Sequence, residues 1–151
     1  MVSVNFAKTE HVKLISEFES ENFKSEAYSF DTLNEMMKDN YLLNNNENIF
    51  SVTNDDDLIG YIIFHISEDF TDIYKIFIRD NDKRKGYATM LLNKVIDMAK
   101  RFNSKKLMIE VRSNNISAIN FYKKNGFIKI NERTDYYSNP KDDAIIYERS
   151  L

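Results

Sequence analysis

One glycine constrains the fold of this chain most. It follows three cations, at the boundary between a strand-like stretch and a helix-like stretch. The 151 residues include only three glycines, Gly60, Gly86 and Gly126. Gly86 follows the run Lys83-Arg84-Lys85, after a strand-like stretch at 73–78 and before a helix-like stretch. The N-terminus of a helix has unpaired backbone N–H groups and a partial positive charge, and it binds phosphate readily. The sequence therefore predicts a strand, an anion-binding loop and a helix in succession.

The helix predicted after Gly86 has the clearest apolar face in the chain. Seven residues at helical spacing form this face: Leu91, Leu92, Val95, Ile96, Met98, Ala99 and Phe102. A strand is predicted next, at 105–112, because apolar and polar residues alternate there. This alternation should place Ile109 on one side of the strand and Glu110 on the other.

The remaining patterns predict a mixed sheet. A short helix should be capped by Asn114 or Asn115 and ended by Gly126. Two helices are predicted before residue 40, the second capped by Ser29 or Asp31, and the asparagine-rich stretch at 40–48 predicts a loop. Further strands are predicted at 2–7, 49–53, 58–66, 71–78, 127–137 and 144–148. The order βααβββαβαββ predicts one α/β domain over residues 1–151, with a mixed central sheet flanked by helices.

The net charge of -3 hides a division between the two halves of the chain. Residues 1–80 carry 16 Asp and Glu against 6 Lys and Arg, whereas residues 81–151 carry 8 against 15. The basic half suits a polyanionic cofactor and the acidic half suits a cationic acceptor, unless both are ordinary solvated surfaces. Five carboxylates cluster around the first two predicted helices: Glu19, Glu21, Glu26, Asp31 and Glu35.

Several classes of site are excluded by what the sequence lacks. Without cysteine the chain has no disulfide framework, no thiolate zinc site and no cysteine nucleophile. His11 and His65 have no partner at ligand spacing, so no metal site is predicted. The longest uncharged apolar-rich run, 58–67, is too short to span a bilayer as a helix, and the first residues lack the pattern of a signal peptide. We therefore expect a cytoplasmic protein that does not enter a membrane.

Taken one at a time, the polar residues near the predicted loop have structural explanations. The loop at 83–88 is neither an ATP-type P-loop nor a GxGxxG motif, and a basic loop with one glycine is commonly a surface turn. Glu110 would pair with Arg112 or a lysine at a strand edge. Tyr122 lies three residues after Ile119, which is typical of an amphipathic tyrosine in a core.

In combination, three segments resemble the GNAT superfamily of N-acetyltransferases. They are the loop at 83–88, the run Glu110-Val111-Arg112-Ser113-Asn114-Asn115 and the stretch at 118–127. Shorter similarities add to them: Ala27-Tyr28-Ser29, Asp135-Tyr136-Tyr137 and Asp143-Ala144. Within the superfamily, the chain is most similar to the bacterial ribosomal-protein-alanine N-acetyltransferases and their protein N-terminal acetyltransferase relatives.

The resemblance implies acetyl-CoA as the acetyl donor, Glu110 as a general base and Tyr122 as a general acid. It also implies a set of cofactor-binding residues: Ile76, Phe77 and Ile78 through their backbone, Arg84, Lys85, Gly86, Tyr87, Ala88 and Thr89 through main-chain N–H groups, and Asn115. The family loop usually begins with Gln or Arg, and here it begins with Lys83. Lysine keeps the charge but lacks the planar, forked guanidinium group of arginine. We therefore expect a less well-defined contact of the loop with the cofactor, rather than a loss of binding.

These observations predict an acetyl-CoA-dependent N-acetyltransferase that acts on a protein N-terminal α-amine, a ribosomal protein among the candidates. Direct attack of the amine in a ternary complex agrees with the lack of a cysteine nucleophile. Two alternatives are an acetyltransferase of a small amine, such as a polyamine or an antibiotic, and a non-catalytic CoA-binding regulator. A nucleic-acid-binding module would explain the basic half but not the acidic one. We expect a monomer or weak dimer and an acceptor with basic residues after its N-terminus.

Overall fold

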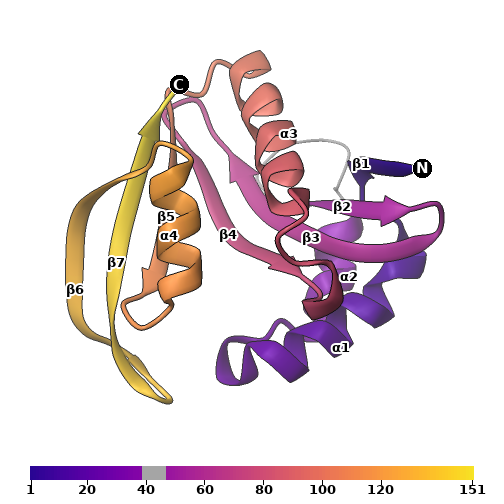
Figure 1. Ribbon diagram of the computed structural model, residues 1–151, viewed down its shortest axis with the longest axis horizontal. Helices are drawn as coiled ribbons and strands as arrows, with labels where there is room; N and C mark the ends of the chain where they lie inside the picture. Colours follow the sequence, from indigo (N-terminus) through magenta and orange to yellow (C-terminus); the bar gives the residue numbers. More distant parts are fainter. Residues whose placement is uncertain (39–46) are drawn as a thin grey trace.

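The computed structural model describes residues 1–38 and 47–151, and the strands within them form one mixed sheet (Figure 1). In these residues seven strands pair in the order β1-β2-β3-β4-β5-β7-β6. The strands are β1 (Val2–Phe6), β2 (Asn48–Asn54), β3 (Asp57–Ile66), β4 (Thr71–Ile78), β5 (Lys106–Arg112), β6 (Ile128–Ser138) and β7 (Lys141–Ser150). The helices are α1 (Val12–Asn22), α2 (Phe30–Lys38), α3 (Tyr87–Arg101) and α4 (Ile116–Lys124). The predicted α/β class and mixed sheet are confirmed.

The loop predicted at 40–48 lies mostly outside the described residues. Of that stretch the structure describes Glu47 and Asn48, and Asn48 is already the first residue of β2. The other predicted elements are found within a few residues of their expected bounds.

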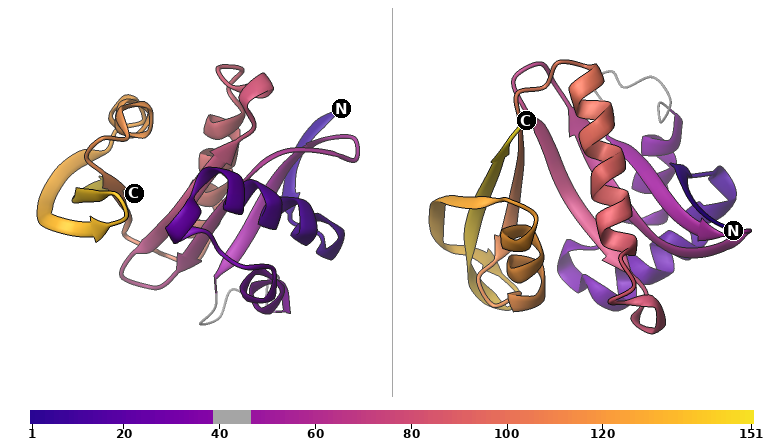
Figure 2. Two further views of the ribbon diagram at one scale, coloured as in Figure 1. Left: turned by 90° about the horizontal axis from the view of Figure 1, so that it is seen from below. Right: turned by 45° about the horizontal axis from the view of Figure 1, so that its top comes forward.

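Helices cover both faces of the sheet (Figure 2). Helices α3 and α4 lie on one face, here called the α3–α4 face, and α1 and α2 lie on the other, the α1–α2 face. Leu91 and Val95 of α3 are buried in the core on the first face, and Ile15 and Leu33 are buried in the core on the second. Phe102 was predicted to join the first core but is 47% exposed, because α3 ends at Arg101 and Phe102 follows it.

The helix ends follow the predicted turn chemistry. Gly86 precedes α3 with φ of 87°, and Gly126 follows α4 with φ of 85°, both in the left-handed region that favours glycine. Asn115 caps α4, since its side-chain oxygen accepts a hydrogen bond of 3.3 Å from the backbone N–H of Ala118. Ser29, rather than Asp31, caps α2 by accepting from the N–H of Thr32 at 3.1 Å.

The sheet is split between β4 and β5. These parallel strands pair only over Thr71–Ile73 with Leu107–Ile109, and they diverge beyond this point (Figure 1). The register of β3 and β4 also shifts at this place, because Ile73 is opposite Phe64 whereas Lys75 is opposite Ile63. Tyr74 is therefore the extra residue of a β-bulge, a feature that bends a strand and re-aims its side chains. The split leaves the backbone edge of β4 after Ile73 without a neighbour in β5.

Candidate active site

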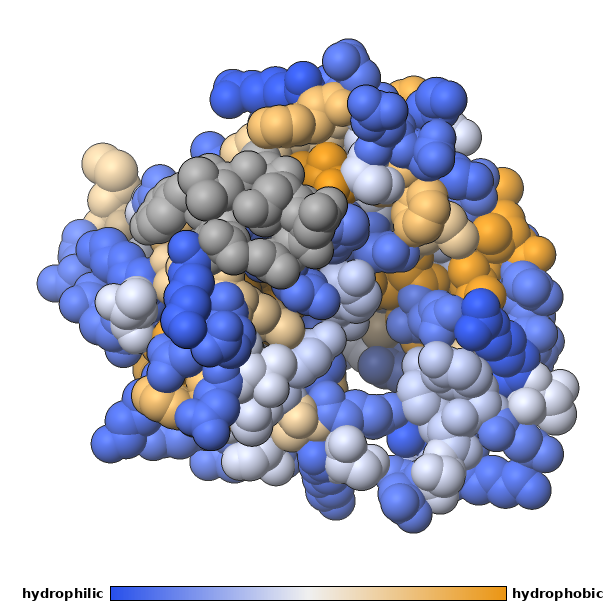
Figure 3. All heavy atoms as spheres, turned by 180° about the vertical axis from the view of Figure 1, so that it is seen from behind, coloured by the Kyte–Doolittle hydropathy of each residue, from blue (hydrophilic) through white to orange (hydrophobic). Residues whose placement is uncertain are grey.

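A cavity of about 550 Å³ opens where β4 and β5 diverge. Its walls come from both strands, from α4, from the segment before α2 and from the β6–β7 hairpin. In the space-filling view of the α1–α2 side, the surface is hollowed between α1 and the hairpin (Figure 3). Ile109 and Tyr122 line the cavity from the core of the α3–α4 face, and Glu110 lines it from the opposite side of β5. The cavity thus joins the two faces through the sheet.

Glu110 stands on the α1–α2 side of this cavity because side chains alternate along β5. Its side chain is 34% exposed, and one carboxylate oxygen lies 3.5 Å from a guanidinium nitrogen of Arg133 on β6. The structural explanation for Glu110 named Arg112 or a lysine as its partner, and the partner is Arg133 instead. A partly buried carboxylate that faces a cavity can accept a proton from a molecule bound there.

Tyr122 stands on the α3–α4 side, where α4 packs against the sheet. It is 3% exposed, and its ring contacts the rings of Phe121 and Phe127 at centroid distances of 5.4 and 5.2 Å. Burial raises the pKa of Tyr122 well above that of a free tyrosine. Its hydroxyl therefore keeps its proton across the physiological pH range.

Arg112 closes the cavity on the hairpin side. Its guanidinium group forms an ion pair of 2.9 Å with Glu26 and donates to the carbonyl oxygen of Pro140 at 2.7 Å. The same group lies 4.2 Å from the ring centroid of Tyr137. One side chain thus holds the segment before α2 against the turn of the hairpin, and both segments line the cavity.

A buried ion pair supports the opposite wall. Glu19 is fully buried, and it accepts hydrogen bonds from the ammonium group of Lys75 at 2.6 Å, the backbone N–H of Tyr28 at 3.0 Å and the hydroxyl of Tyr61. The ammonium group also lies over the rings of Phe23 and Tyr28, at 4.2 and 4.4 Å from their centroids. The sheet and the segment before α2 are therefore held together by one fully satisfied network.

This role of Glu19 was not predicted from the sequence. Glu19 was grouped with the carboxylates around the first two predicted helices, but its carboxylate is buried and paired with Lys75. The available signal was its spacing, because Glu19 follows Ile15 by four residues and Val12 by seven, on the buried face of α1. Glu26 and Glu35 are also paired, with Arg112 and Lys38 respectively. Fewer unpaired carboxylates of this cluster therefore remain to attract a cationic acceptor.

The glycine loop lies outside the cavity lining, at the start of α3. No side chain of the described residues caps the first turn of α3, so the backbone N–H groups of Tyr87, Ala88 and Thr89 remain available. The lysines of the loop are balanced by the preceding turn, since Lys83 lies 2.8 Å from Asp80 and Lys85 3.4 Å from Asp82. Among the three cations of the loop, Arg84 has no such acidic partner in the described residues.

The other predicted cofactor residues are divided between cavity and core. Ile76 and Asn115 line the cavity. The side chains of Phe77 and Ile78 are buried in the two cores, on opposite faces of the sheet. Their backbone belongs to the part of β4 that β5 does not pair with. Among the described residues no group of three or more His, Cys, Asp or Glu is placed to hold a metal ion.

The sequence matches the model of the acetyltransferase (GNAT) family over residues 12–127. A curated relative, the [ribosomal protein bS18]-alanine N-acetyltransferase of Salmonella typhimurium, is 31% identical over 97 residues, which are 63% of this chain and 66% of that protein. The match thus covers slightly less than two thirds of that relative. Because the family model covers more than half of the chain, the chain belongs to the GNAT acetyltransferase family.

Solved structures share the fold over nearly the whole chain. The ribosomal-protein-S18-alanine N-acetyltransferase from Escherichia coli has a TM-score of 0.83 at 23% identity and covers 100% of this chain and 94% of its own. A GNAT family acetyltransferase from Elizabethkingia anophelis with acetyl-CoA bound has a TM-score of 0.76 at 15% identity, covering 99% and 98%. Acetyl-CoA is the acetyl donor of this family.

Proposed function

We propose that this member of the GNAT family transfers an acetyl group from acetyl-CoA to the α-amine of a protein N-terminus. One observation carries the proposal: a single cavity crosses the sheet, with Glu110 on one side of β5 and Tyr122 on the other. Glu110 would then accept a proton from the acceptor amine on one face of the sheet, and Tyr122 would donate a proton to the CoA thiolate on the other. The described residues contain no helix long and apolar enough to cross a membrane, and a cytoplasmic location is part of the proposal.

The residues at the donor side fit acetyl-CoA. The pyrophosphate would be held by main-chain N–H groups from Arg84 to Thr89, at the uncapped start of α3. A Cβ added at Gly86 would meet no atom of the chain within 4 Å, so the space beside this residue is open. The pantetheine arm would take backbone partners from 76–78, on the unpaired edge of β4, with Asn115 beside it.

The two ionisable residues would divide the proton transfers between them. Acetyl-CoA supplies an activated acetyl thioester. Glu110 accepts a proton from the attacking amine, through water, because its partly buried carboxylate faces the α1–α2 side of the cavity. Tyr122 gives its proton to the departing thiolate from the other side. The amine attacks directly, so no acetylated enzyme forms.

Elementary acid–base chemistry favours an α-amine over a lysine. The pKa of an α-amine is about 7.7–8.0 and that of a lysine side chain about 10.4. At pH 7 roughly a tenth of the α-amine is free base, against fewer than about one in 1,000 lysine side chains. The similarity to an enzyme that acts on a ribosomal-protein alanine supports the same choice.

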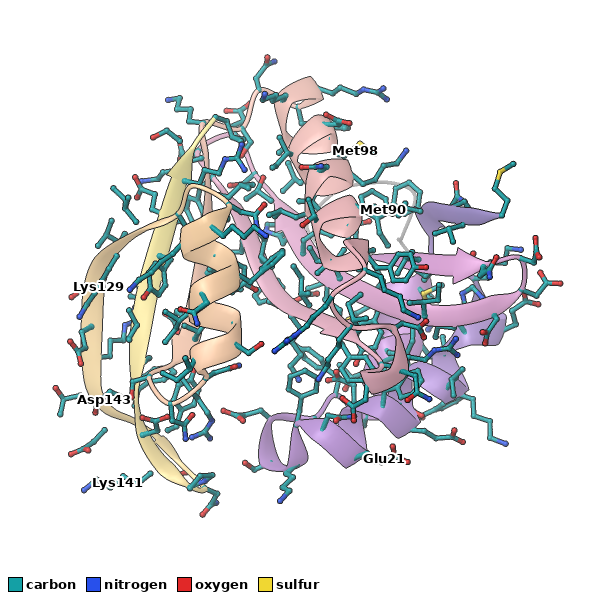
Figure 4. The ribbon with its side chains drawn as sticks, in the orientation of Figure 1. Glu21, Met90, Met98, Lys129, Lys141 and Asp143 are labelled. Carbon is teal, nitrogen blue, oxygen red and sulfur yellow. The ribbon has the colours of Figure 1, made fainter. Side chains whose placement is uncertain are left out.

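Of the predicted acidic cluster, Glu21 stays exposed on α1 and points outward (Figure 4).

The expected acceptor is a peptide with a free small N-terminal residue followed by basic residues. With acetyl-CoA present, the protein should acetylate the α-amine of such a peptide about 100-fold faster than its lysine side chains at pH 7, because of the difference in free base. Mass spectrometry with fragmentation locates the acetyl group. The control is the same peptide with a blocked α-amine and free lysines, which should not react.

The same panel includes spermidine and an aminoglycoside as small amines. Faster acetylation of either, or of lysine side chains, than of every peptide α-amine would replace the proposal with the small-amine function. Binding of CoA without transfer to any amine would indicate the non-catalytic regulator instead.

Gly86→Val should weaken acetyl-CoA binding by about tenfold or more, equivalent to about 1.4 kcal/mol. A branched side chain would fill the open space beside the loop where we place the pyrophosphate. Isothermal titration calorimetry measures the change. Lys83→Gln should have a smaller effect, since Asp80 already balances the charge of Lys83.

Gly126→Val is the matched control for backbone strain. Gly126 has φ of 85°, close to the 87° of Gly86, and an added Cβ would lie at an ordinary 3.8 Å from Arg149. This variant bears similar strain but lies outside the loop, so its affinity for acetyl-CoA should be normal. Equal losses in the two variants, or unchanged affinity in a folded Gly86→Val protein, would remove the phosphate-loop assignment.

A further inference from the structure

Asp72 differs from the other two carboxylates of the cavity because it has no ion-pair partner among the described residues. Glu26 is paired with Arg112, and Glu110 is paired with Arg133. Asp72 lines the same cavity, and it makes no hydrogen bond or ion pair through its side chain with any residue in 1–38 or 47–151. A half-buried carboxylate without a partner loses part of its hydration and gains nothing in return. A cation that entered the cavity would relieve this cost.

The position of Asp72 brings it to the same side of the sheet as Glu110. Asp72 lies opposite Met108 in the short parallel ladder, where the split begins, and Glu110 follows Met108 by two residues on the same face of β5. On the other flank, β3 places His65 opposite Asp72. Burial raises the pKa of Asp72, and the charge of Glu110 raises it further while His65 lowers it. Two carboxylates, those of Asp72 and Glu110, thus face the same cavity, close to the place where it passes through the sheet.

Three tyrosine rings, those of Tyr28, Tyr74 and Tyr137, line the rest of the cavity wall. Lys75 already lies over Tyr28 and Arg112 over Tyr137, so Tyr74 is the one of the three whose ring carries no cation of the described residues. Burial, with a smaller effect of Asp72, raises the pKa of Tyr74 to about 12, so the ring stays neutral. The neutral ring of Tyr74 beside the carboxylate of Asp72 is therefore suited to an ammonium group.

We propose that Asp72 is a specificity-determining residue that binds the α-ammonium group of the acceptor and holds it beside Glu110. The proposal rests on the acetyltransferase function proposed above and assigns binding, rather than proton transfer, to Asp72. The acceptor arrives as a cation, pairs with Asp72, and then loses its proton towards Glu110. Asp72 therefore selects acceptors that present an ammonium group in the cavity over those whose end is uncharged.

The test compares two peptides that differ only in the ammonium group. One is Ala-Lys-Lys-Ser-Gly-Tyr, and the other carries a propionyl group in place of the N-terminal alanine. Calorimetry measures their binding to the protein saturated with CoA, which cannot transfer an acetyl group. The wild-type protein should bind the amine peptide roughly 10- to 100-fold more tightly, as expected for a hydrogen bond between charged groups. Asp72→Asn should bind both peptides within about threefold of each other.

Two control variants and two further measurements separate binding from other roles. Asp72→Glu keeps the charge and should retain the discrimination, and so should Asp69→Asn, an exposed carboxylate on the turn before β4. Asp72→Asn should not lower the thermal midpoint, because it removes an unpaired buried charge. With acetyl-CoA it should raise KM and leave kcat within about threefold, whereas loss of a general acid or base costs about 100-fold or more.

Continued discrimination by Asp72→Asn would overturn the assignment. A fall in kcat as large as that in Glu110→Gln, with KM unchanged, would also overturn it, because Asp72 would then move a proton. Failure of the wild-type protein to bind either peptide would instead refute the peptide-acceptor function, and the role of Asp72 with it.

Discussion

Replacing Tyr122 with phenylalanine should lower kcat by about 100- to 10,000-fold while the affinity for acetyl-CoA stays unchanged. The substitution removes one oxygen atom and keeps the ring contacts with Phe121 and Phe127. Burial keeps Tyr122 protonated, so the wild-type hydroxyl can protonate the leaving thiolate, and phenylalanine cannot. Because the chain has no cysteine, a thiol reagent detects only the CoA that the reaction releases.

Tyr147→Phe is the matched control for this substitution. Tyr147 is also buried, at 2% exposed, in the same core, but it does not line the cavity. A loss of activity from a perturbed core would affect both variants, whereas a loss of the proton donor affects Tyr122→Phe alone. Full activity in Tyr122→Phe would leave Tyr122 with a packing role only.

Glu110→Gln should lower kcat by about 100- to 10,000-fold at pH 7, since glutamine cannot accept the proton of the amine. The deficit should narrow as pH rises through the pKa of the α-amine, about 7.7–8.0, because the acceptor then arrives as the free base. Steady-state rates with the alanine peptide, measured from pH 6.5 to 9.5, test both expectations.

Glu132→Gln provides the control for the loss of one negative charge near the hairpin. Glu132 lies on β6 next to Arg133 and pairs with Lys129 at 2.9 Å, outside the cavity lining. Its removal should leave kcat unchanged. If Glu110→Gln kept full activity at pH 7, proton removal would have to proceed through solvent, and the role proposed for Glu110 would be wrong.

Local patterns were sufficient to predict the elements that carry the site. Helical spacing identified α3, and alternation along β5 correctly separated Ile109 from Glu110. Glycine and asparagine chemistry located both ends of α4, since Asn115 caps it and Gly126 leaves it at positive φ. These features depend on residues close in sequence, and periodicity records which side of an element is buried.

The features that were not predicted depend on contacts between distant residues. Nothing local shows that β5 stops pairing with β4 after Ile109, because this depends on the bulge at Tyr74 and on the pairing of β5 with β7. The burial of Glu19 depends on Lys75, which is 56 residues away. The cavity, its unpaired Asp72 and the partner of Glu110 follow from that tertiary arrangement.

The alternation of β5 also bears on how such proteins diversify. Leu107, Ile109 and Val111 contribute to the α3–α4 core beside the proposed donor site, and the last two also line the cavity from that side, whereas Met108, Glu110 and Arg112 line it from the other side of β5. In the proposed function, the two sides of this one strand would serve the donor and the acceptor separately. A substitution at position 108 would then alter the acceptor side and leave the donor side unchanged. Gene duplicates could thus acquire new acceptors while Glu110 is retained for the chemistry.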